Sequence, residues 1–352
     1  MGGTLGAGKT TLLNHLLRNV HDRRLGVIVN DFGSINVDAE LIVGVDGDLV
    51  QLGNGCICCT IQDDLVQALR RLLAVERPPQ HVIVEASGVS DPRRVAATLE
   101  SQVSADMAVI DAVVVVLDVE HYLGLGRRDR IAAGGPIAAA DILVLNKVDL
   151  VDEAELEALE GRLRRRSRSG RVLRAVRGQV APALVLGVAA FDPSQVPLDQ
   201  GPEVHVHELR EDEPASDHEH AHHHDGHHAH EYWTWSFRSE RPLSARRLRR
   251  AVDELPETVV RAKGTVLLAS HPRRRAVMHV VGRRAELCLD EPWGDREPTT
   301  GLVLIGAGEP LSPRRLEELF RACEVDPGET GAAGAVMRWV RRVLPSKESS
   351  AG

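Results

Sequence analysis

The sequence lacks the features that mark membrane and secreted proteins. No run of about 18 or more apolar residues occurs, so we expect no membrane-spanning helix. The first residues also lack the basic-then-apolar layout of a signal peptide. We therefore expect a cytoplasmic protein without a membrane partner.

Acidic residues outnumber basic ones. Lys and Arg number 43 against 51 Asp and Glu, which gives a formal net charge of -8. A protein that binds nucleic acid needs a clustered basic face to neutralise phosphates. The two Arg runs, Arg164–Arg166 and Arg273–Arg275, each lie near acidic residues, so we interpret them as solvated surface. No nucleic-acid partner is expected.

Cysteine is rare but clustered. The 352 residues contain five cysteines, and three of them are Cys56, Cys58 and Cys59. This clustering favours a metal or redox site in a reducing compartment over a framework of disulfides. The isolated Cys288 and Cys323 are most simply small core residues.

The length and the 43% hydrophobic content allow two domains with sizeable cores. Residues 1–190 alternate short apolar runs with amphipathic segments, which predicts an α/β fold, a mostly parallel sheet flanked by helices. The expected strands are Leu25–Asn30, His81–Glu85, Ala112–Asp118 and Asp141–Asn146, and the expected helices are Lys9–Arg18, Asp63–Ala74 and Asp91–Val103.

The composition changes after residue 190. Residues 191–231, rich in Pro, Asp, Glu and His, are predicted to be a linker. A smaller α+β domain is predicted over residues 232–326, and a flexible tail over residues 327–352. The expected strands of the second domain are Tyr232–Arg238, Thr265–Ala269, Ala276–Gly282 and Leu302–Gly306, and its expected helices are Ser244–Leu255 and Ser312–Cys323.

A phosphate-binding motif lies near the start of the chain. The segment Gly3–Thr10 fits G-x-x-x-x-G-K-[ST] without a mismatch, so a loop that merely turns the chain is the weaker interpretation. In this motif backbone N–H groups face the phosphates, the lysine meets the β and γ oxygens, and the hydroxyl ligates Mg²⁺. The expected nucleotide contacts are Gly3, Gly6, Ala7, Gly8, Lys9, Thr10 and Thr11.

Two strand ends carry further nucleotide chemistry. Glu85 ends an apolar strand, where a buried carboxylate is costly unless a cation such as Mg²⁺ meets it. After another strand come Asn146, Lys147 and Asp149. The Asp149 carboxylate can accept from the N1–H and amino groups of guanine, which adenine does not offer in pairs. We therefore predict GTP, with Lys9, Thr10 and Glu85 as the catalytic residues.

The cysteine cluster predicts a transition-metal site. Three thiolates on one turn suit Zn²⁺ or Cu(I) and leave one coordination position open. A vicinal disulfide or inert buried thiols are the alternatives. Softness and affinity order favour zinc, with Co²⁺ or another divalent metal as the alternative.

A histidine run can gather further divalent metal with low geometric precision, the alternative being a solvated linker. Its auxiliary ligands are His218, His220, His222, His223, His224, His227, His228 and His230.

Together these motifs resemble the CobW family of metal-handling GTPases, which includes a cobalamin-biosynthesis protein and zinc-regulated metallochaperones. The resemblance rests on the phosphate loop, Asn30-Asp-Phe-Gly, Gly55-Cys-Ile-Cys-Cys-Thr, Glu85-Ala-Ser-Gly and Asn146-Lys-Val-Asp, in the family's order. The region from Tyr232 to Val325, with Arg261-Ala-Lys-Gly264, resembles the family's C-terminal domain.

The resemblance implies that Cys56, Cys58 and Cys59 bind metal beside the nucleotide and that Asn30–Asp38 is a switch segment. GTP binding or hydrolysis would drive metal delivery to a client metalloprotein, and a nucleotide- or metal-dependent homodimer is possible. The sequence departs from the family at Ser34, where many relatives carry Glu. A second departure is that only two residues precede Gly3, so the family's first strand is expected to be missing.

We therefore expect a GTPase whose nucleotide state and metal affinity are coupled. Three other functions are weighed against it: a non-enzymatic metal buffer that stores ions on the histidine run, a cobalt-insertion accessory protein, and a phosphotransferase that uses the same phosphate loop. A buffer would show no GTP turnover that depends on Lys9. A phosphotransferase would place phosphate on a product other than water.

Overall fold

The structure is a computed structural model that describes residues 1–21, 23–29, 49–51, 60–86, 92–104, 107–166, 171–187, 203–208 and 231–325. These residues form two compact units. Within the described ranges, one unit holds residues 1–187 with 205–208, 231–234 and 305–310, and the other holds residues 203–204, 235–304 and 311–325. Over the described ranges, no helix has both the length and the apolar character needed to cross a membrane.

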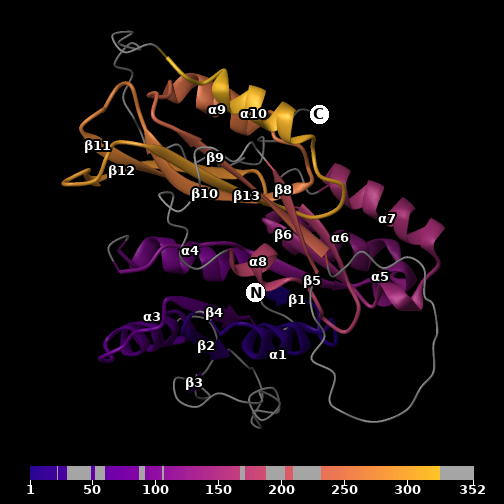
Figure 1. The fold of residues 1–352 in the computed structure, drawn as a ribbon. Helices are drawn as coiled ribbons and strands as arrows, with labels where there is room; N and C mark the ends of the chain where they lie inside the picture. Colours follow the sequence, from indigo (N-terminus) through magenta and orange to yellow (C-terminus); the bar gives the residue numbers. More distant parts are fainter. Residues whose placement is uncertain are drawn as a thin grey trace, which may run out of the picture. The chain divides into compact units, whose positions relative to one another are not determined.

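The first unit is an α/β structure of parallel strands (Figure 1). Its strands are β1 (Gly2–Gly3), β2 (Leu25–Val29), β3 (Leu49–Gln51), β4 (His81–Glu85), β5 (Val114–Asp118), β6 (Ile142–Asn146) and β7 (Arg171–Ala175). Its helices are α1 (Lys9–Asn19), α3 (Thr60–Leu73), α4 (Pro92–Gln102), α5 (Val119–Gly124), α6 (Arg127–Ala139), the 3-10 helix η1 (Val148–Leu150), α7 (Glu153–Arg166) and α8 (Pro182–Leu186). The hydrogen-bonded orders are β1-β5-β6-β7 and β3-β2-β4, and every pair is parallel.

The start of the chain lies between these two sets of strands. The Met1 nitrogen donates to Val84 O at 2.6 Å, and Ala86 N donates to Met1 O at 2.8 Å. On the other side Gly2 and Gly3 pair in parallel with β5. The sequence predicts no strand here, whereas the structure has the two-residue β1, because ladder hydrogen bonds need only backbone. Gly3 is required, since an added Cβ would lie 2.3 Å from Val116 O.

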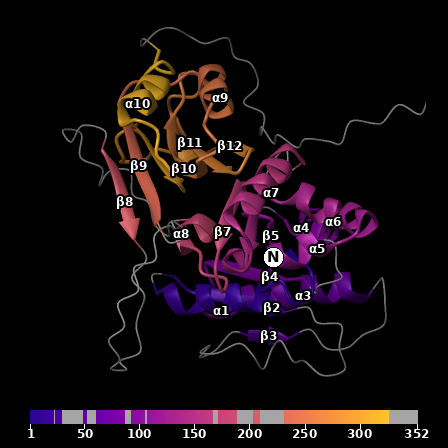
Figure 2. The same ribbon diagram turned by 90° about the vertical axis from the view of Figure 1, so that its right-hand side faces the viewer.

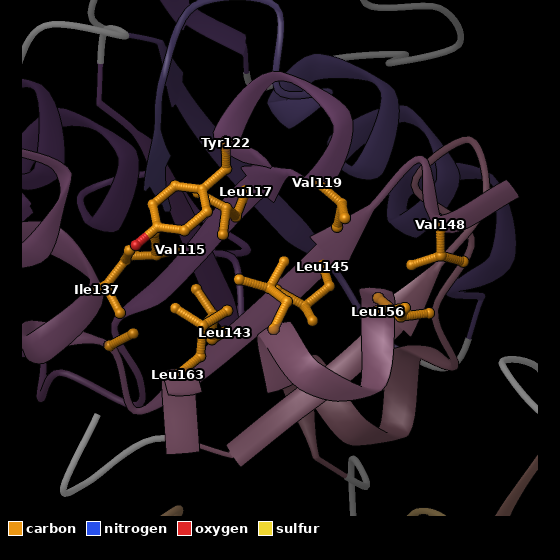
Figure 3. Close-up of a cluster of buried hydrophobic side chains, with 12 residues drawn as sticks. Val115, Leu117, Val119, Tyr122, Ile137, Leu143, Leu145, Val148, Leu156 and Leu163 are labelled. Carbon is orange, nitrogen blue, oxygen red and sulfur yellow. The ribbon is translucent and has the colours of Figure 1, made fainter. Parts of the chain in front are cut away.

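The apolar strands β5 and β6 are covered by α5, α6 and α7. Val115, Leu117, Leu143 and Leu145 point from the strands into a cluster with helix side chains such as Leu163 (Figure 3). All five are at most 4% exposed. Because these strands are apolar almost throughout, the sequence predicted that both of their faces are buried. Every residue of β5 and β6 is buried in the structure. The cluster holds the carboxyl ends of β5 and β6 in place, and these ends carry the site.

Most of the second unit belongs to a six-stranded sheet in the order β12-β11-β10-β13-β9-β8, of which residues 205–208, 231–234 and 305–306 are assigned to the first unit. Its strands are β8 (Val204–Glu208), β9 (Glu231–Ser239), β10 (Val259–Leu267), β11 (Arg274–Val281), β12 (Arg284–Pro292) and β13 (Thr300–Gly306). Helices α9 (Ala245–Asp253) and α10 (Pro313–Arg321) lie side by side along it (Figure 2). The Trp235 ring of β9 stacks on the Phe320 ring of α10 with 5.7 Å between centroids, and the Phe237 ring of β9 is tilted against Phe320 at 5.4 Å. The antiparallel pairs β10·β11 and β11·β12, together with α9 and α10, confirm the predicted α+β class.

The sequence placed the central elements well but missed others. Helices α1, α3 and α4 and strands β2, β4, β5 and β6 lie within three residues of their predicted bounds. Strand β10 begins at Val259, six residues before the predicted start, and β7 and β12 were not predicted. The strand β8 (Val204–Glu208) lies within the predicted linker 191–231, so that segment is not a linker throughout. Of the two isolated cysteines, Cys323 is buried and Cys288 only partly so. Burial raises the pKa of the Cys323 thiol to about 11, as expected for an inert core residue.

Candidate nucleotide site

The phosphate loop joins β1 to α1 through three glycines in backbone conformations that other residues rarely adopt. Gly3, Gly6 and Gly8 have φ of 146°, 73° and 97°. A Cβ at Gly6 would meet nothing within 4 Å, whereas a Cβ at Gly8 would lie 2.2 Å from Asn146 Nδ2. The loop therefore has open space on one side and close packing on the other. This arrangement fits a cradle for phosphate oxygens.

Lys9 begins α1 and is held inward. Its side chain is 7% exposed, and its Nζ donates to Thr4 O at 3.1 Å, within the same loop. A buried ammonium is costly unless it has partners. Phosphate oxygens would be stronger acceptors than a single carbonyl oxygen, because they carry negative charge. The position of Lys9 fits the role predicted for it.

Thr10 and Glu85 meet although 75 residues separate them in sequence. The Thr10 hydroxyl donates to Glu85 Oε1 at 3.3 Å, and the Glu85 carboxylate at the end of β4 is 2% exposed. Burial lowers the pKa of the Met1 amino group to about 6. The nearby Glu85 carboxylate acts against this shift, and the Lys9 ammonium adds to it. A hydroxyl oxygen beside a carboxylate oxygen is the donor set that Mg²⁺ accepts. The two residues thus fit the predicted magnesium role.

Asn146 ties the phosphate loop to the end of β7. Its Nδ2 donates to Ala7 O at 2.9 Å, and its Oδ1 accepts from Gly178 N at 2.8 Å. The side chain is 2% exposed, so both bonds lie in a buried environment. Gly178 has φ of 68°, and an added Cβ would lie 2.7 Å from Leu12 N. Asn146 therefore joins the loops that follow β1, β6 and β7 at one edge of the sheet. We call these two hydrogen bonds the Asn146 bracket.

Lys147 follows in a strained conformation. Its φ of 64° is one of two positive values among non-glycine residues in the described part of the chain, the other being at Arg177. Its Nζ lies 2.6 Å from Asp118 Oδ2 at the end of β5. Asp118 Oδ1 also accepts from His121 N at 2.9 Å and caps α5. The lysine is therefore anchored to the neighbouring strand.

Asp149 presents its carboxylate to solvent. It lies in η1 and is exposed, next to a hollow formed by residues of α5, η1 and α7. The other residues that line the hollow are Glu120, Leu123, Leu150, Val151, Asp152 and Glu155. An accessible carboxylate three residues after Asn146, which itself contacts the phosphate loop, can accept hydrogen bonds from a guanine base. The phosphate and base groups of the predicted site thus come together on one edge of the sheet.

Comparison with known proteins also indicates a nucleotide-binding domain. The CobW/HypB/UreG nucleotide-binding domain matches residues 1–174, and the cobalamin synthesis protein cobW C-terminal domain matches residues 232–324. A protein named zinc chaperone CobW from Sinorhizobium is 32% identical over 340 residues, which cover 86% of this chain and 90% of the relative. The chain belongs to the CobW family.

Two further relatives match the same share of the chain. Zinc chaperone CobW of Pseudomonas aeruginosa is 29% identical and covers 86% of this chain, with 85% of its own length matched. Zinc chaperone YjiA of Escherichia coli is 27% identical over 86% of this chain and 92% of its own. Membership of the CobW/HypB/UreG GTPase family explains why the phosphate loop and Asn146-Lys-Val-Asp occur together.

The predicted transition-metal ligands of this CobW family member lie outside the described residues. They are Cys56, Cys58 and Cys59 and the histidines from His218 to His230, and the predicted switch segment Asn30–Asp38 also lies outside, whereas the predicted Mg²⁺ ligands Thr10 and Glu85 are described. In the part of the chain that is described, no group of three or more His, Cys, Asp or Glu side chains could hold a metal ion. The structure therefore describes the residues of the predicted nucleotide site but not the predicted zinc ligands.

Sequence reasoning missed Asp118 and Gly178. Asp118 ends the apolar run Val113-Val-Val-Val-Leu in the same way that Glu85 ends its strand, so the same signal marks it. Gly178 follows β7, a strand with alternating buried and half-buried residues that the search for fully apolar runs did not detect. Once β7 is placed, a glycine just beyond its end is a candidate for close backbone approach.

Proposed function

We propose that this chain is a GTP-hydrolysing metallochaperone that binds zinc and delivers it to a client metalloprotein. The observation that carries the GTPase half is the bracket at Asn146. It joins the phosphate loop to the segment that bears Lys147 and Asp149, so phosphate and base are recognised by one connected unit. The metal half is supported by the three clustered cysteines and by relatives whose names include zinc chaperone.

Each residue of the site has a defined part in this proposal. The Lys9 ammonium exchanges Thr4 O for phosphate oxygens, and the Thr10 hydroxyl and Glu85 carboxylate hold Mg²⁺. The Asp149 carboxylate accepts from the N1–H and amino groups of guanine. Bound Mg²⁺ supplies charge neutralisation between the phosphate oxygens. Zinc bound at Cys56, Cys58 and Cys59 is the cargo, and its affinity follows the nucleotide state through the segment Asn30–Asp38.

The wider proposal keeps the domain plan drawn from the sequence. Residues 1–190 form the GTPase domain, residues 191–231 the histidine-rich linker, and residues 232–326 the C-terminal domain. The protein acts in the cytoplasm, where thiolates stay reduced. The histidine run gathers metal as an auxiliary store, and assembly into a homodimer would depend on nucleotide or metal.

Phosphate release from GTP and from ATP by the purified full chain tests the nucleotide half. We expect slow turnover that prefers GTP and needs Mg²⁺, that disappears in Lys9→Ala, and that persists in Arg18→Ala. Arg18 is the matched control because it is an exposed cation on the same helix. GTP turnover that persists in Lys9→Ala would contradict the proposal that this site hydrolyses GTP. Transfer of phosphate to an acceptor other than water would favour the phosphotransferase.

Zinc binding tests the metal half. Equilibrium dialysis should find one tightly bound zinc ion that is lost when Cys56, Cys58 and Cys59 are replaced together by serine. The matched control is Cys323→Ser, a buried thiol in the second unit, where zinc binding should persist. Tight zinc binding that persists in the triple variant would instead assign the metal to the histidine run.

A further inference from the structure

Asp118 occupies a particular place at the edge of the sheet. It is the last residue of β5, and in the parallel register with β6 it lies opposite Asn146. The chain that leaves β6 therefore passes directly beside it. Both carboxylate oxygens are engaged, Oδ1 by the backbone N–H of His121 and Oδ2 by the Lys147 ammonium. The residue is 7% exposed, so water competes little for these bonds.

Lys147 depends on this contact for a defined conformation. Its left-handed backbone is unfavourable for a residue with a Cβ. Its long side chain is 35% exposed and would otherwise sample many rotamers. The hydrogen bonds of Asn146 hold the adjacent backbone, and the ion pair with Asp118 holds the ammonium. The methylene stem between them is held next to the segment that bears Asp149.

We propose that Asp118 is a positioning residue for the purine base, acting through Lys147. This inference rests on the proposed GTP function and deepens it. Asp118 holds the Lys147 stem where it can lie against the face of the base, and it contacts neither the base nor the phosphates. Its loss weakens base binding while the phosphate loop, held by Gly3, Gly8 and Asn146, keeps its geometry.

The variant Asp118→Asn separates this role from helix capping. An asparagine side chain also caps helices well, so α5 keeps its start, but it lacks the charge that holds the Lys147 ammonium. Asp118→Ser is a second variant that caps α5 but is too short to reach Lys147. The matched control is Asp141→Asn. Asp141 is equally buried at 7% and accepts a backbone N–H bond from Val113, but it precedes β6 at the opposite edge of the sheet.

The affinities of the full chain for GDP, ADP and inorganic tripolyphosphate, each with Mg²⁺, test the proposal. Asp118→Asn and Asp118→Ser should each weaken GDP binding about tenfold, the ratio for one lost hydrogen bond to a charged group. Binding of tripolyphosphate, which engages the phosphate loop alone, should stay within about twofold. Asp141→Asn should bind GDP like the original chain.

A double-variant cycle with Lys147→Ala completes the test. Once Lys147 is truncated, Asp118→Asn should change GDP affinity by less than about twofold, because Asp118 acts only through that side chain. Equal losses for GDP and tripolyphosphate, or additive effects with Lys147→Ala, would overturn the proposal. If the original chain binds ADP as tightly as GDP, the proposed GTP function fails. A clear preference of the original chain for GDP over ADP, together with a GDP affinity that Asp118→Asn leaves unchanged, overturns the positioning role alone.

Discussion

The Asn146 side-chain amide lies 2.9 Å from the Ala7 carbonyl oxygen, which joins the end of β6 to the phosphate loop across 139 residues. Replacing Asn146 by alanine would leave the buried Ala7 C=O and Gly178 N–H groups without their partner. We expect the free energy of unfolding to fall by about 2 to 4 kcal/mol, at about 1 to 2 kcal/mol for each buried group. Chemical denaturation followed by circular dichroism measures this change.

Asn19→Ala is the control for that prediction. Asn19 lies on the exposed end of α1 and donates to His15 O at 2.8 Å, so water can replace its bond. Its loss should change the unfolding free energy by less than about 0.5 kcal/mol. Comparable effects of the two substitutions would show that the bracket contributes nothing beyond an ordinary surface hydrogen bond.

Gly178→Ala tests the close approach of the loop after β7 to α1. The new Cβ would lie 2.7 Å from the backbone nitrogen of Leu12, and φ of 68° is unfavourable for alanine. We expect destabilisation by about 2 kcal/mol or more, because backbone must move to make room. Gly124→Ala is the matched control, since a Cβ there meets nothing within 4 Å and Gly124 ends a helix. That variant should be neutral or slightly more stable in thermal unfolding.

Asp149→Asn should change which base the site accepts. Guanine presents two donors to the carboxylate, its N1–H and its amino group. Xanthine presents one donor and one carbonyl acceptor instead, and an amide matches this pair. GTP binding should weaken about 100-fold, for two charge-assisted hydrogen bonds of about 1.5 kcal/mol each. Competition between GTP and XTP measures the change, and a variant that still prefers GTP would refute the assigned role.

The sequence predicted the parts of the fold that depend on strong local signals. Uninterrupted Val, Ile and Leu runs mark buried parallel strands, so β2, β4, β5 and β6 were predictable. The glycines, Lys9 and Thr10 of the phosphate loop follow a fixed spacing that geometry enforces. Asp149 was predictable because it lies in a short motif directly after a strand.

Other parts depend on contacts that only the folded chain creates. Nothing in the local sequence indicates that Asn146 accepts from Gly178, because the contact needs β6 and β7 to be neighbours. The Lys147 and Asp118 pair likewise arises from the parallel register between β5 and β6. The two-residue β1 was missed because Gly2 and Gly3 carry no apolar signal, and the backbone alone forms the pairing.

The affinity for zinc in two nucleotide states tests the central claim most directly. Purified full chain would be titrated against a chromogenic zinc chelator, once with GDP and once with Mg²⁺ and a GTP analogue that resists hydrolysis. We predict zinc affinities that differ by about tenfold or more, and zinc should change the ratio of the two nucleotide affinities by the same factor. Identical zinc affinities in both states, in a chain that binds both nucleotides, would contradict the account.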